Sequence, residues 1–196
     1  MSDDTPLVLV VEDEPDLAEL YRTWLAESYR VRTAGDGRTA LEELDDEVDV
    51  VLLDRRMPDL SGDEVLERIR EGGFECRVAM VTAVEPDTDI VDMAFDDYLV
   101  KPVSEEELVR TVENLRLRDE YDDGVKRLFS LASKKALLEA ENDRIALESD
   151  MDYRRLRADL ADLRDELDDK LATLGESDDL SLIYQDLARD ADDTDE

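Results

Sequence analysis

Short apolar runs recur along the first half of the chain, and amphipathic segments with helical spacing separate them. The clearest runs are LVLVV at residues 7–11, VDVVLL at 48–53 and VAMV at 78–81, and weaker ones at 29–33 and 98–100 make five. A strand that is apolar on both sides is typical of a parallel sheet with helices on both faces. Because strands alternate with helices, the sequence predicts an α/β fold with a doubly wound, five-stranded parallel sheet.

The segment after the first run has the plainest helical pattern. Its apolar residues recur at i, i+3, i+4, i+7 and i+8, as in a helix that packs on a sheet: Leu17, Leu20, Tyr21, Trp24 and Leu25. Pro15 suits the first turn of this helix, where no N–H is needed. Two further helices are predicted from capping boxes, Ser61 with Glu64 and Ser104 with Glu107. A helix should therefore begin directly after each of these signals.

Polar residues stand where the predicted strands end. The five residues that close or directly follow a strand are Glu12, Asp13, Asp54, Thr82 and Lys101. In an open α/β sheet, sites form beyond the carboxyl ends of the strands, near the point where strand order reverses. With the order 2-1-3-4-5, the first and third strands are neighbours. The three carboxylates should then converge on one pocket.

The composition limits the chemistry of this pocket. The chain has no histidine and a single cysteine, so a serine–histidine triad and a His/Cys metal cage are excluded. Clustered carboxylate oxygens suit Mg²⁺, which keeps several waters and leaves positions open for a phosphoryl group. Asp54 would then be a nucleophile, and Lys101 and the Thr82 hydroxyl would donate to phosphoryl oxygens.

Four motifs, in order, resemble the receiver domain of two-component response regulators. They are EDEP at residues 12–15, DRRMPDLSG at 54–62, VTA at 81–83 and DDYLVKP at 96–102. Each motif lies at the end of a predicted strand. The resemblance covers roughly residues 1–118 and implies a flavodoxin-like fold.

The resemblance implies a role for each residue of the pocket. Asp54 is implied as the phosphoacceptor, Asp13 as a direct magnesium ligand, and Glu12 as a helper in metal binding. The backbone carbonyl of Arg56 would complete the magnesium shell, and Lys101 would pair with the phosphoryl group.

The resemblance also implies a phosphodonor and a switch. A sensor histidine kinase would supply the phosphoryl group, and the chain would be a signalling protein and not a turnover enzyme. Phosphorylation would draw the Thr82 hydroxyl inward, and the Tyr98 ring would rotate to fill the space. The peptide bond before Pro102 is expected to be cis.

One segment departs from the family pattern. The distance along the chain from Thr82 to Lys101 is shorter than in most receivers by about one helical turn. The small pair that usually precedes the DDY sequence is replaced by Met93, Ala94 and Phe95. We therefore expect the fourth helix of the receiver to be short or distorted.

The second half of the chain has helical patterning, no strand signal and no proline. The segment DEYDDG at residues 119–124 indicates a joint, so we predict a receiver domain at 1–118, a helical domain at 119–175, and a short helix with an acidic flexible tail at 176–196. A nearly regular 3-4 alternation predicts an all-α helical hairpin or short coiled coil: Tyr153, Leu156, Leu160, Leu163, Leu167 and Leu174. Residues 121–175 resemble the HalX domain, which is attached to receivers in haloarchaea.

The net charge is −33, from 57 acidic and 24 basic residues, and the excess is spread along the chain. This composition resembles that of proteins from salt-loving archaea, since concentrated salt screens the mutual repulsion. Residues 119–196 hold 25 acidic and 11 basic residues, which does not support nucleic-acid binding. The absence of a long apolar run or signal sequence predicts a cytoplasmic protein.

Three hypotheses for the output stay open. The phosphorylated regulator could act through a homodimer or partner protein at its C-terminal helices, it could bind DNA directly, or the chain could be an unphosphorylated scaffold. A rival enzyme class is the haloacid-dehalogenase-like phosphatases. These need a second aspartate two residues after the nucleophile, where this chain has Arg56.

Overall fold

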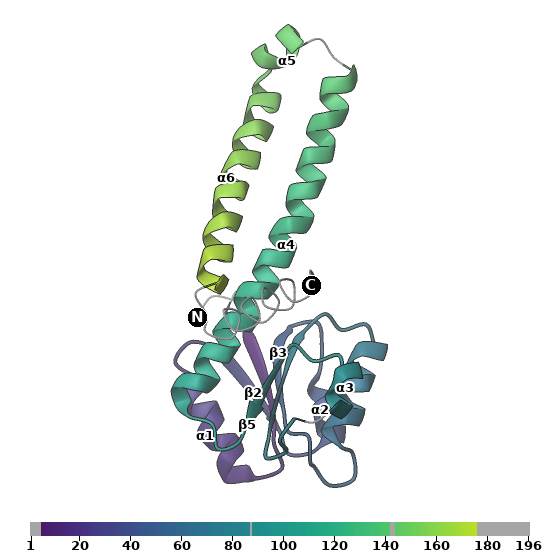
Figure 1. Ribbon diagram of the computed structural model, residues 1–196, viewed down its shortest axis with the longest axis vertical. Helices are drawn as coiled ribbons and strands as arrows, with labels where there is room; N and C mark the ends of the chain where they lie inside the picture. The colour runs from purple at the N-terminus through teal and green to yellow at the C-terminus, as the bar shows by residue number, and fades with distance from the viewer. Residues whose placement is uncertain (1–4, 87, 142–143, 176–196) are drawn as a thin grey trace, which may run out of the picture. The chain divides into compact units, whose positions relative to one another are not determined.

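The structure is a computed structural model that describes residues 5–86, 88–141 and 144–175 (Figure 1). The chain divides into two compact units, Met1–Arg116 and Leu117–Glu196. The described part of the first unit is an α/β domain, and that of the second is helical. None of the helices in the described ranges is long and apolar enough to cross a membrane.

A five-stranded parallel sheet forms the centre of the first unit. Its strands are β1 (Leu7–Val11), β2 (Arg30–Ala34), β3 (Val48–Leu53), β4 (Arg77–Thr82) and β5 (Asp97–Val100). Their order is β2-β1-β3-β4-β5, and every neighbouring pair is parallel, which confirms the prediction. The carboxyl ends of all five strands therefore lie along one edge of the sheet.

Helices pack on both faces of this sheet. They are α1 (Pro15–Leu25), α2 (Gly37–Glu43), α3 (Gly62–Glu71) and the first turns of α4 (Glu105–Glu141). Pro15 begins α1, and Ser61 forms the predicted capping box with Glu64. The sequence patterns did not predict α2, which is capped by Asp36 but is too short to show a helical repeat. Among the described residues between β4 and β5, the helical structure is a five-residue 3-10 helix, Thr88–Asp92, in agreement with the expected short fourth helix.

The side chains of each central strand divide between two apolar cores. In β1, Leu7, Leu9 and Val11 pack with residues of α2 and α3, while Val8 and Val10 face α1 and α4. This alternation follows from the two-residue period of a strand. In α1 the inner line is Ala18, Tyr21 and Leu25, and Leu20 is 42% exposed, so its predicted contact with the sheet is wrong. Ala18 takes the inner position because the buried line follows i, i+3, i+7.

The second unit contains the rest of α4, α5 (Arg144–Ser149) and α6 (Met151–Gly175). Helix α4 continues through residues 119–124, so the chain does not break at the predicted joint, although the division between the two units falls just before it, after Arg116. Gly124 has a packing role instead, because a Cβ at this position would lie 2.5 Å from Cδ2 of Leu167. A glycine in this helix lets the two long helices approach closely.

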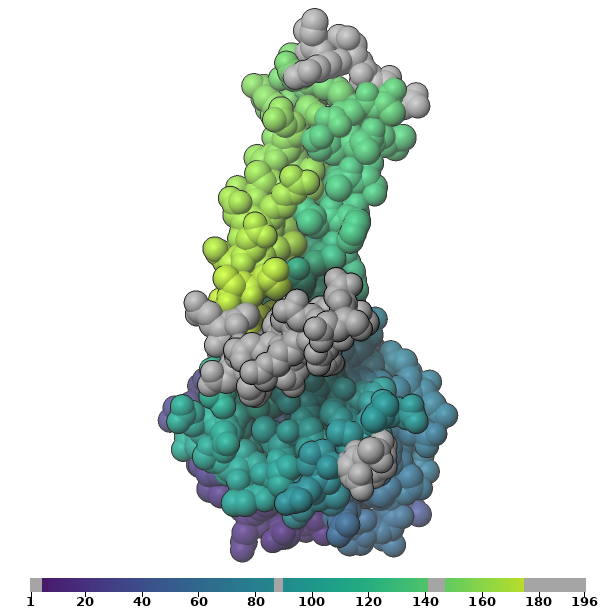
Figure 2. All heavy atoms as spheres, viewed as in Figure 1, coloured from purple at the N-terminus to yellow at the C-terminus, as the bar shows by residue number. Residues whose placement is uncertain are grey.

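Helices α4 and α6 lie side by side as an antiparallel hairpin, as predicted (Figures 1 and 2). Lys170 pairs with Glu120 at 2.9 Å, and the Tyr153 hydroxyl donates to Glu139 at 2.6 Å. The buried residues of α6 come from the predicted apolar stripe: Tyr153, Leu160, Leu163, Leu167 and Leu174. The short helix and tail predicted at 176–196 lie outside the described residues.

Candidate functional site

Three carboxylates meet at the carboxyl ends of β1 and β3. Glu12 and Asp13 follow β1, and Asp54 follows β3. Sheet-like backbone bonds fix these positions, since Glu12 N donates to Ala34 O and Asp54 N donates to Val11 O, both at 3.0 Å. One oxygen from each of the three carboxylates lies within 4.8 Å of the other two. Glu12 and Asp54 are buried, whereas Asp13 is partly exposed.

Lys101 brings a positive charge into this cluster from the end of β5. Its Nζ donates to Oε2 of Glu12 and to Oδ2 of Asp54, each at 2.6 Å. The backbone N–H of Lys101 donates to Thr82 O at 2.8 Å, and the Lys101–Pro102 peptide bond is cis, as expected. The lysine therefore bridges two of the three carboxylates.

Burial governs the electrostatics of these groups. It raises the pKa of Glu12 above its usual value, although the hydrogen bond and charge of Lys101 act in the opposite direction. Burial alone would lower the pKa of Lys101, but hydrogen bonds to Asp54 and Glu12 outweigh it, and this pKa is raised. The carboxylate cluster thus holds its lysine charged and favours cations.

The donor atoms of the cluster fit a magnesium ion. They are carboxylate oxygens, which Mg²⁺ prefers, and one ligand group is accessible at Asp13. Oδ1 of Asp54 accepts a hydrogen bond from the backbone N–H of Arg56 at 3.1 Å, which holds the following loop against the cluster. Glu12, Asp13 and Asp54 could therefore hold the ion, with the loop backbone beside them.

Thr82 and Tyr98 are connected through the loop after β4. Thr82 ends β4 and is fully buried, and its hydroxyl oxygen accepts from the N–H of Val84 at 3.4 Å. The Tyr98 hydroxyl donates to the carbonyl of Val84 at 2.8 Å, and its ring lies 5.5 Å from that of Phe95. The same loop residue therefore contacts both predicted switch residues.

The loop between β3 and α3 folds tightly over the site. Gly62 N donates to Arg55 O at 2.9 Å, and a Cβ at Gly62 would lie 2.2 Å from the carbonyl oxygen of Asp54. Only glycine allows this approach without a shift of the backbone. The position of Asp54 thus depends on a residue eight positions later.

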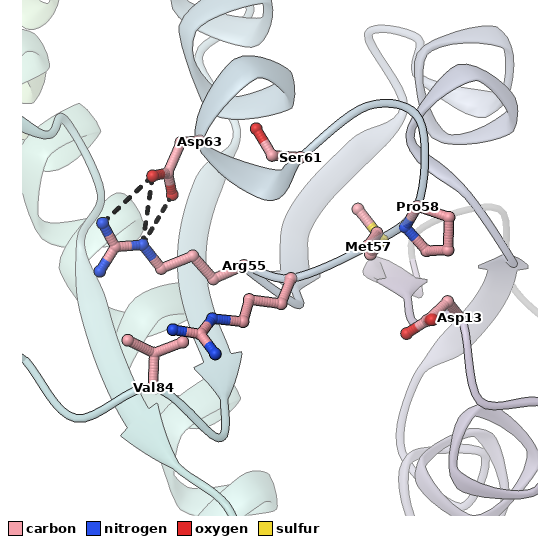
Figure 3. A pocket seen from close by; sticks show the side chains of 8 residues that line it. Asp13, Arg55, Met57, Pro58, Ser61, Asp63 and Val84 are labelled. Atoms are coloured by element: carbon pink, nitrogen blue, oxygen red, sulfur yellow. Dashed lines mark hydrogen bonds and ion pairs between the residues drawn. The ribbon is translucent and has the colours of Figure 1, made fainter.

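An open pocket of about 570 Å³ adjoins the cluster (Figure 3). Asp13 lies on one side of it, and on the other Arg55 donates to both carboxylate oxygens of Asp63, with the shortest distance 2.9 Å. The residues that line it are Asp13, Arg55, Arg56, Met57, Pro58, Ser61, Asp63 and Val84. Sequence reasoning missed the Arg55–Asp63 pair because residues eight apart across a loop leave no local pattern.

A second network that sequence reasoning missed fastens the short connection between β4 and β5. Arg70, in the last turn of α3, donates to Ala94 O at 2.9 Å, Cys76 O at 2.7 Å and Asp96 at 2.9 Å. Asp96 also accepts from Val78 N at 2.8 Å. These bonds join the last turn of α3 to the start of β4 and to the end of the connection just before β5, so they hold that end of the connection in place.

Two family models match the chain, one for the response regulator receiver domain at residues 8–113 and one for the HalX domain at residues 117–184. The chain belongs to the response regulator family. Its receiver domain carries the acidic cluster, Lys101 and the loop after Asp54, and the described part of its HalX domain is the helical hairpin. The resemblance seen in the motifs is thereby confirmed over both domains.

Several known proteins are similar to this response regulator. A candidate transcriptional regulator of Haloferax volcanii is 53% identical over 163 residues, which are 83% of this chain and 27% of that protein. The transcriptional regulatory protein YrkP of Bacillus subtilis is 34% identical, over 76% of this chain and 70% of its own length. The chain thus spans about a quarter of the Haloferax relative and more of YrkP.

Solved receiver domains have the same fold. The receiver domain of a LuxO-type repressor from Vibrio parahaemolyticus is 28% identical with a TM-score of 0.57, over 61% of this chain and 96% of that one. The BeF3-activated DrrB receiver domain is 28% identical with a TM-score of 0.53, over 57% of this chain and 97% of that one. Both matches cover about the length of the first unit of this response regulator.

Proposed function

We propose that this response regulator is switched by a phosphoryl group on Asp54. The observation that carries the proposal is the buried Asp54 carboxylate, held within 4.8 Å of two further carboxylates and hydrogen-bonded to Lys101. An open pocket adjoins this cluster and gives a phosphodonor a route of approach. A nucleophile, a set of metal ligands and a compensating cation thus occur together at one sheet edge.

The proposed donor is the phosphohistidine of a sensor histidine kinase. The N–P bond of the donor breaks, an O–P bond forms on an Asp54 carboxylate oxygen, and the departing imidazole takes up a proton. Hydrolysis of the acyl phosphate later returns Asp54 and inorganic phosphate. The phosphoryl group is therefore a reversible signal, and the proposed role of the chain is signalling. When bound at this site, Mg²⁺ would supply positive charge that offsets the negative charge of the phosphoryl oxygens.

The residues of this chain have distinct tasks in the proposed transfer. Glu12, Asp13 and Asp54 would hold the metal, and the backbone carbonyl of Arg56 would be a further ligand. The Lys101 ammonium group already donates a hydrogen bond to Oδ2 of Asp54. It is therefore placed to exchange that bond for one to a phosphoryl oxygen. Thr82 supplies a hydroxyl donor from the end of β4.

The switch proposed for this receiver acts through Val84. Movement of the Thr82 hydroxyl toward the phosphoryl group would break its bond with Val84 N. The same residue accepts the Tyr98 hydroxyl, so the loop and the tyrosine would move together. This coupling depends on two hydrogen bonds to Val84, so a substitution that removes one of them tests it.

The output is proposed to pass from a receiver domain at 1–118 to a HalX domain at 119–175. The Haloferax and Bacillus relatives are both named for transcriptional regulation, and this supports a role in transcription. The acidic balance of residues 119–196 favours a contact with protein over direct DNA binding.

Phosphate incorporation tests the proposal. The full chain in molar KCl with Mg²⁺ and labelled acetyl phosphate should gain acid-labile, hydroxylamine-sensitive label, and Asp54→Asn should gain none. Equal labelling of both proteins, or of neither, would refute the assignment and favour an unphosphorylated scaffold. A DNA mobility shift of the phosphorylated chain in molar KCl separates protein contact from direct DNA binding.

A further inference from the structure

The helical hairpin has one side with an exposed aromatic ring that the proposed function does not use. Phe129 of α4 is 70% exposed, although exposing a phenylalanine ring to water is unfavourable in free energy. Along the same side of α4, Val125 and Ala136 stand four residues before it and seven after it, the spacing of one helix face. We call these residues, with Arg157, Ala161 and Asp168 of α6, the Phe129 face.

The two helices contribute to the same side of the hairpin. A pocket of about 540 Å³ marks one side, where Lys134 of α4 and Asp152 of α6 both line it. Phe129 and Arg157 are each five residues from these, a rotation of about 140° at 3.6 residues per turn. Because the helices are antiparallel, both rotations lead to the side away from the pocket. Ala161 and Asp168 share the side of Arg157 at i+4 and i+11.

Acidic and basic residues are unevenly distributed along the hairpin, and the order along the chain is reversed between its two helices. In α4, residues 117–125 hold four acidic residues and one basic, and residues 126–141 hold two acidic and four basic. In α6, residues 151–157 hold one acidic residue and three basic, and residues 158–175 hold six acidic and two basic. The end of the hairpin next to α5, residues 126–157, holds eight basic and six acidic residues in all and is thus weakly basic, whereas the opposite end is strongly acidic.

We propose that the Phe129 face is the interface of a homodimer in which two hairpins pack antiparallel. A reversed copy sets each basic end against an acidic end, whereas a parallel copy sets like charges together. An acidic partner of another kind would match only the basic end, so a second copy satisfies the observed division best. The arrangement has two-fold symmetry and is closed.

The register of the dimer follows from the contacts within one hairpin. Glu120 pairs with Lys170, Gly124 contacts Leu167 and Glu139 contacts Tyr153, so Phe129 is level with about Asp162. A two-fold axis at this level brings Phe129 against its copy.

The same axis pairs two opposite charges between the copies. Arg157 and Asp168 lie five and six residues from Asp162 in opposite directions. Arg157 of one copy is therefore level with Asp168 of the other, on the same face.

The oligomeric state of the full, unphosphorylated chain tests this dimer. Light scattering after gel filtration in molar KCl should give twice 22.4 kDa for the wild type, and Phe129→Asp should give the monomer with an unchanged circular dichroism spectrum. Phe129→Ser serves as a milder second variant. Leu137→Asp is the matched control, since Leu137 is 66% exposed but lines the pocket, and it should stay dimeric.

A charge swap tests the antiparallel order. Arg157→Asp and Asp168→Arg should each raise the dissociation constant about tenfold, and the double variant should restore it. A monomeric wild type, a dimer that Phe129→Asp leaves intact, or a double variant weaker than both single ones would overturn the proposal. Because Asp54→Asn should dimerise like the wild type, failure here leaves the phosphorylation proposal untouched.

Discussion

Gly62→Ala should disturb the phosphoacceptor through the backbone alone. The new Cβ would lie 2.2 Å from the carbonyl oxygen of Asp54 and 2.8 Å from Cα of Arg55, where ordinary contacts begin at 3.4 Å. Both neighbours are backbone atoms, so no side chain can rotate away. The loop after β3 must move by about 1 Å, and Asp54 must move with it.

The expected loss of stability follows from two opposing effects. Forced overpacking of this kind costs about 1–3 kcal/mol. Replacing a glycine at the start of a helix by alanine recovers about 0.5–1 kcal/mol, because the unfolded chain loses freedom. The free energy of unfolding should therefore fall by about 1–2 kcal/mol. Phosphorylation should fall more, since a displacement of about 1 Å at a reacting group can cost a factor of about 100.

Urea unfolding in molar KCl, followed by the fluorescence of Trp24, measures this effect. Trp24 is the only tryptophan in the sequence and packs against the core of the first unit, so it reports on the receiver. Gly35→Ala is the matched control, because no atom lies within 4 Å of its Cβ, and it should change stability by less than about 0.5 kcal/mol. An unchanged urea midpoint and normal labelling for Gly62→Ala would refute the reasoning.

Three further variants test the charges and hydrogen bonds around the site. Lys101→Met should lower the free energy of unfolding of the magnesium-free protein by about 3 kcal/mol, because buried carboxylates lose their cation. In urea unfolding, MgCl₂ should restore part of the lost stability. Unchanged stability without MgCl₂ would contradict the electrostatic argument. Tyr98→Phe should cost about 1 kcal/mol, because it removes the bond to Val84 O; a larger loss would mean that ring packing has changed. Asp96→Asn should cost about 2 kcal/mol by weakening charged hydrogen bonds, and equal unfolding midpoints would show that the network adds little.

The residues at the strand ends show how much of the site local sequence patterns can predict. Apolar runs place Glu12, Asp54 and Lys101 at strand ends, and strand polarity then requires these ends to share one edge. The structure brings the three side chains within hydrogen-bond distance, as that reasoning expects. The short spacing between Thr82 and Lys101 likewise predicts a reduced helix, because chain length limits the number of turns.

Other features depend on contacts between distant residues. The glycine at position 124 resembles a joint in sequence, yet it lies inside α4, where Leu167 of α6 packs against it. Leu20 fits the apolar stripe but is 42% exposed, and Ala18 is buried in its place, because packing on the sheet decides which line of the helix is buried.

The sequence by itself determined the alternation of strands and helices, the residues at each strand end, the family and the helical second module. Only the tertiary structure decided which polar groups bind one another: Lys101 with two carboxylates, Arg55 with Asp63, and Arg70 with Asp96. The physical reason is that periodicity and capping act within a few residues of the chain. Ion pairs and close packing act through space, between residues that folding brings together.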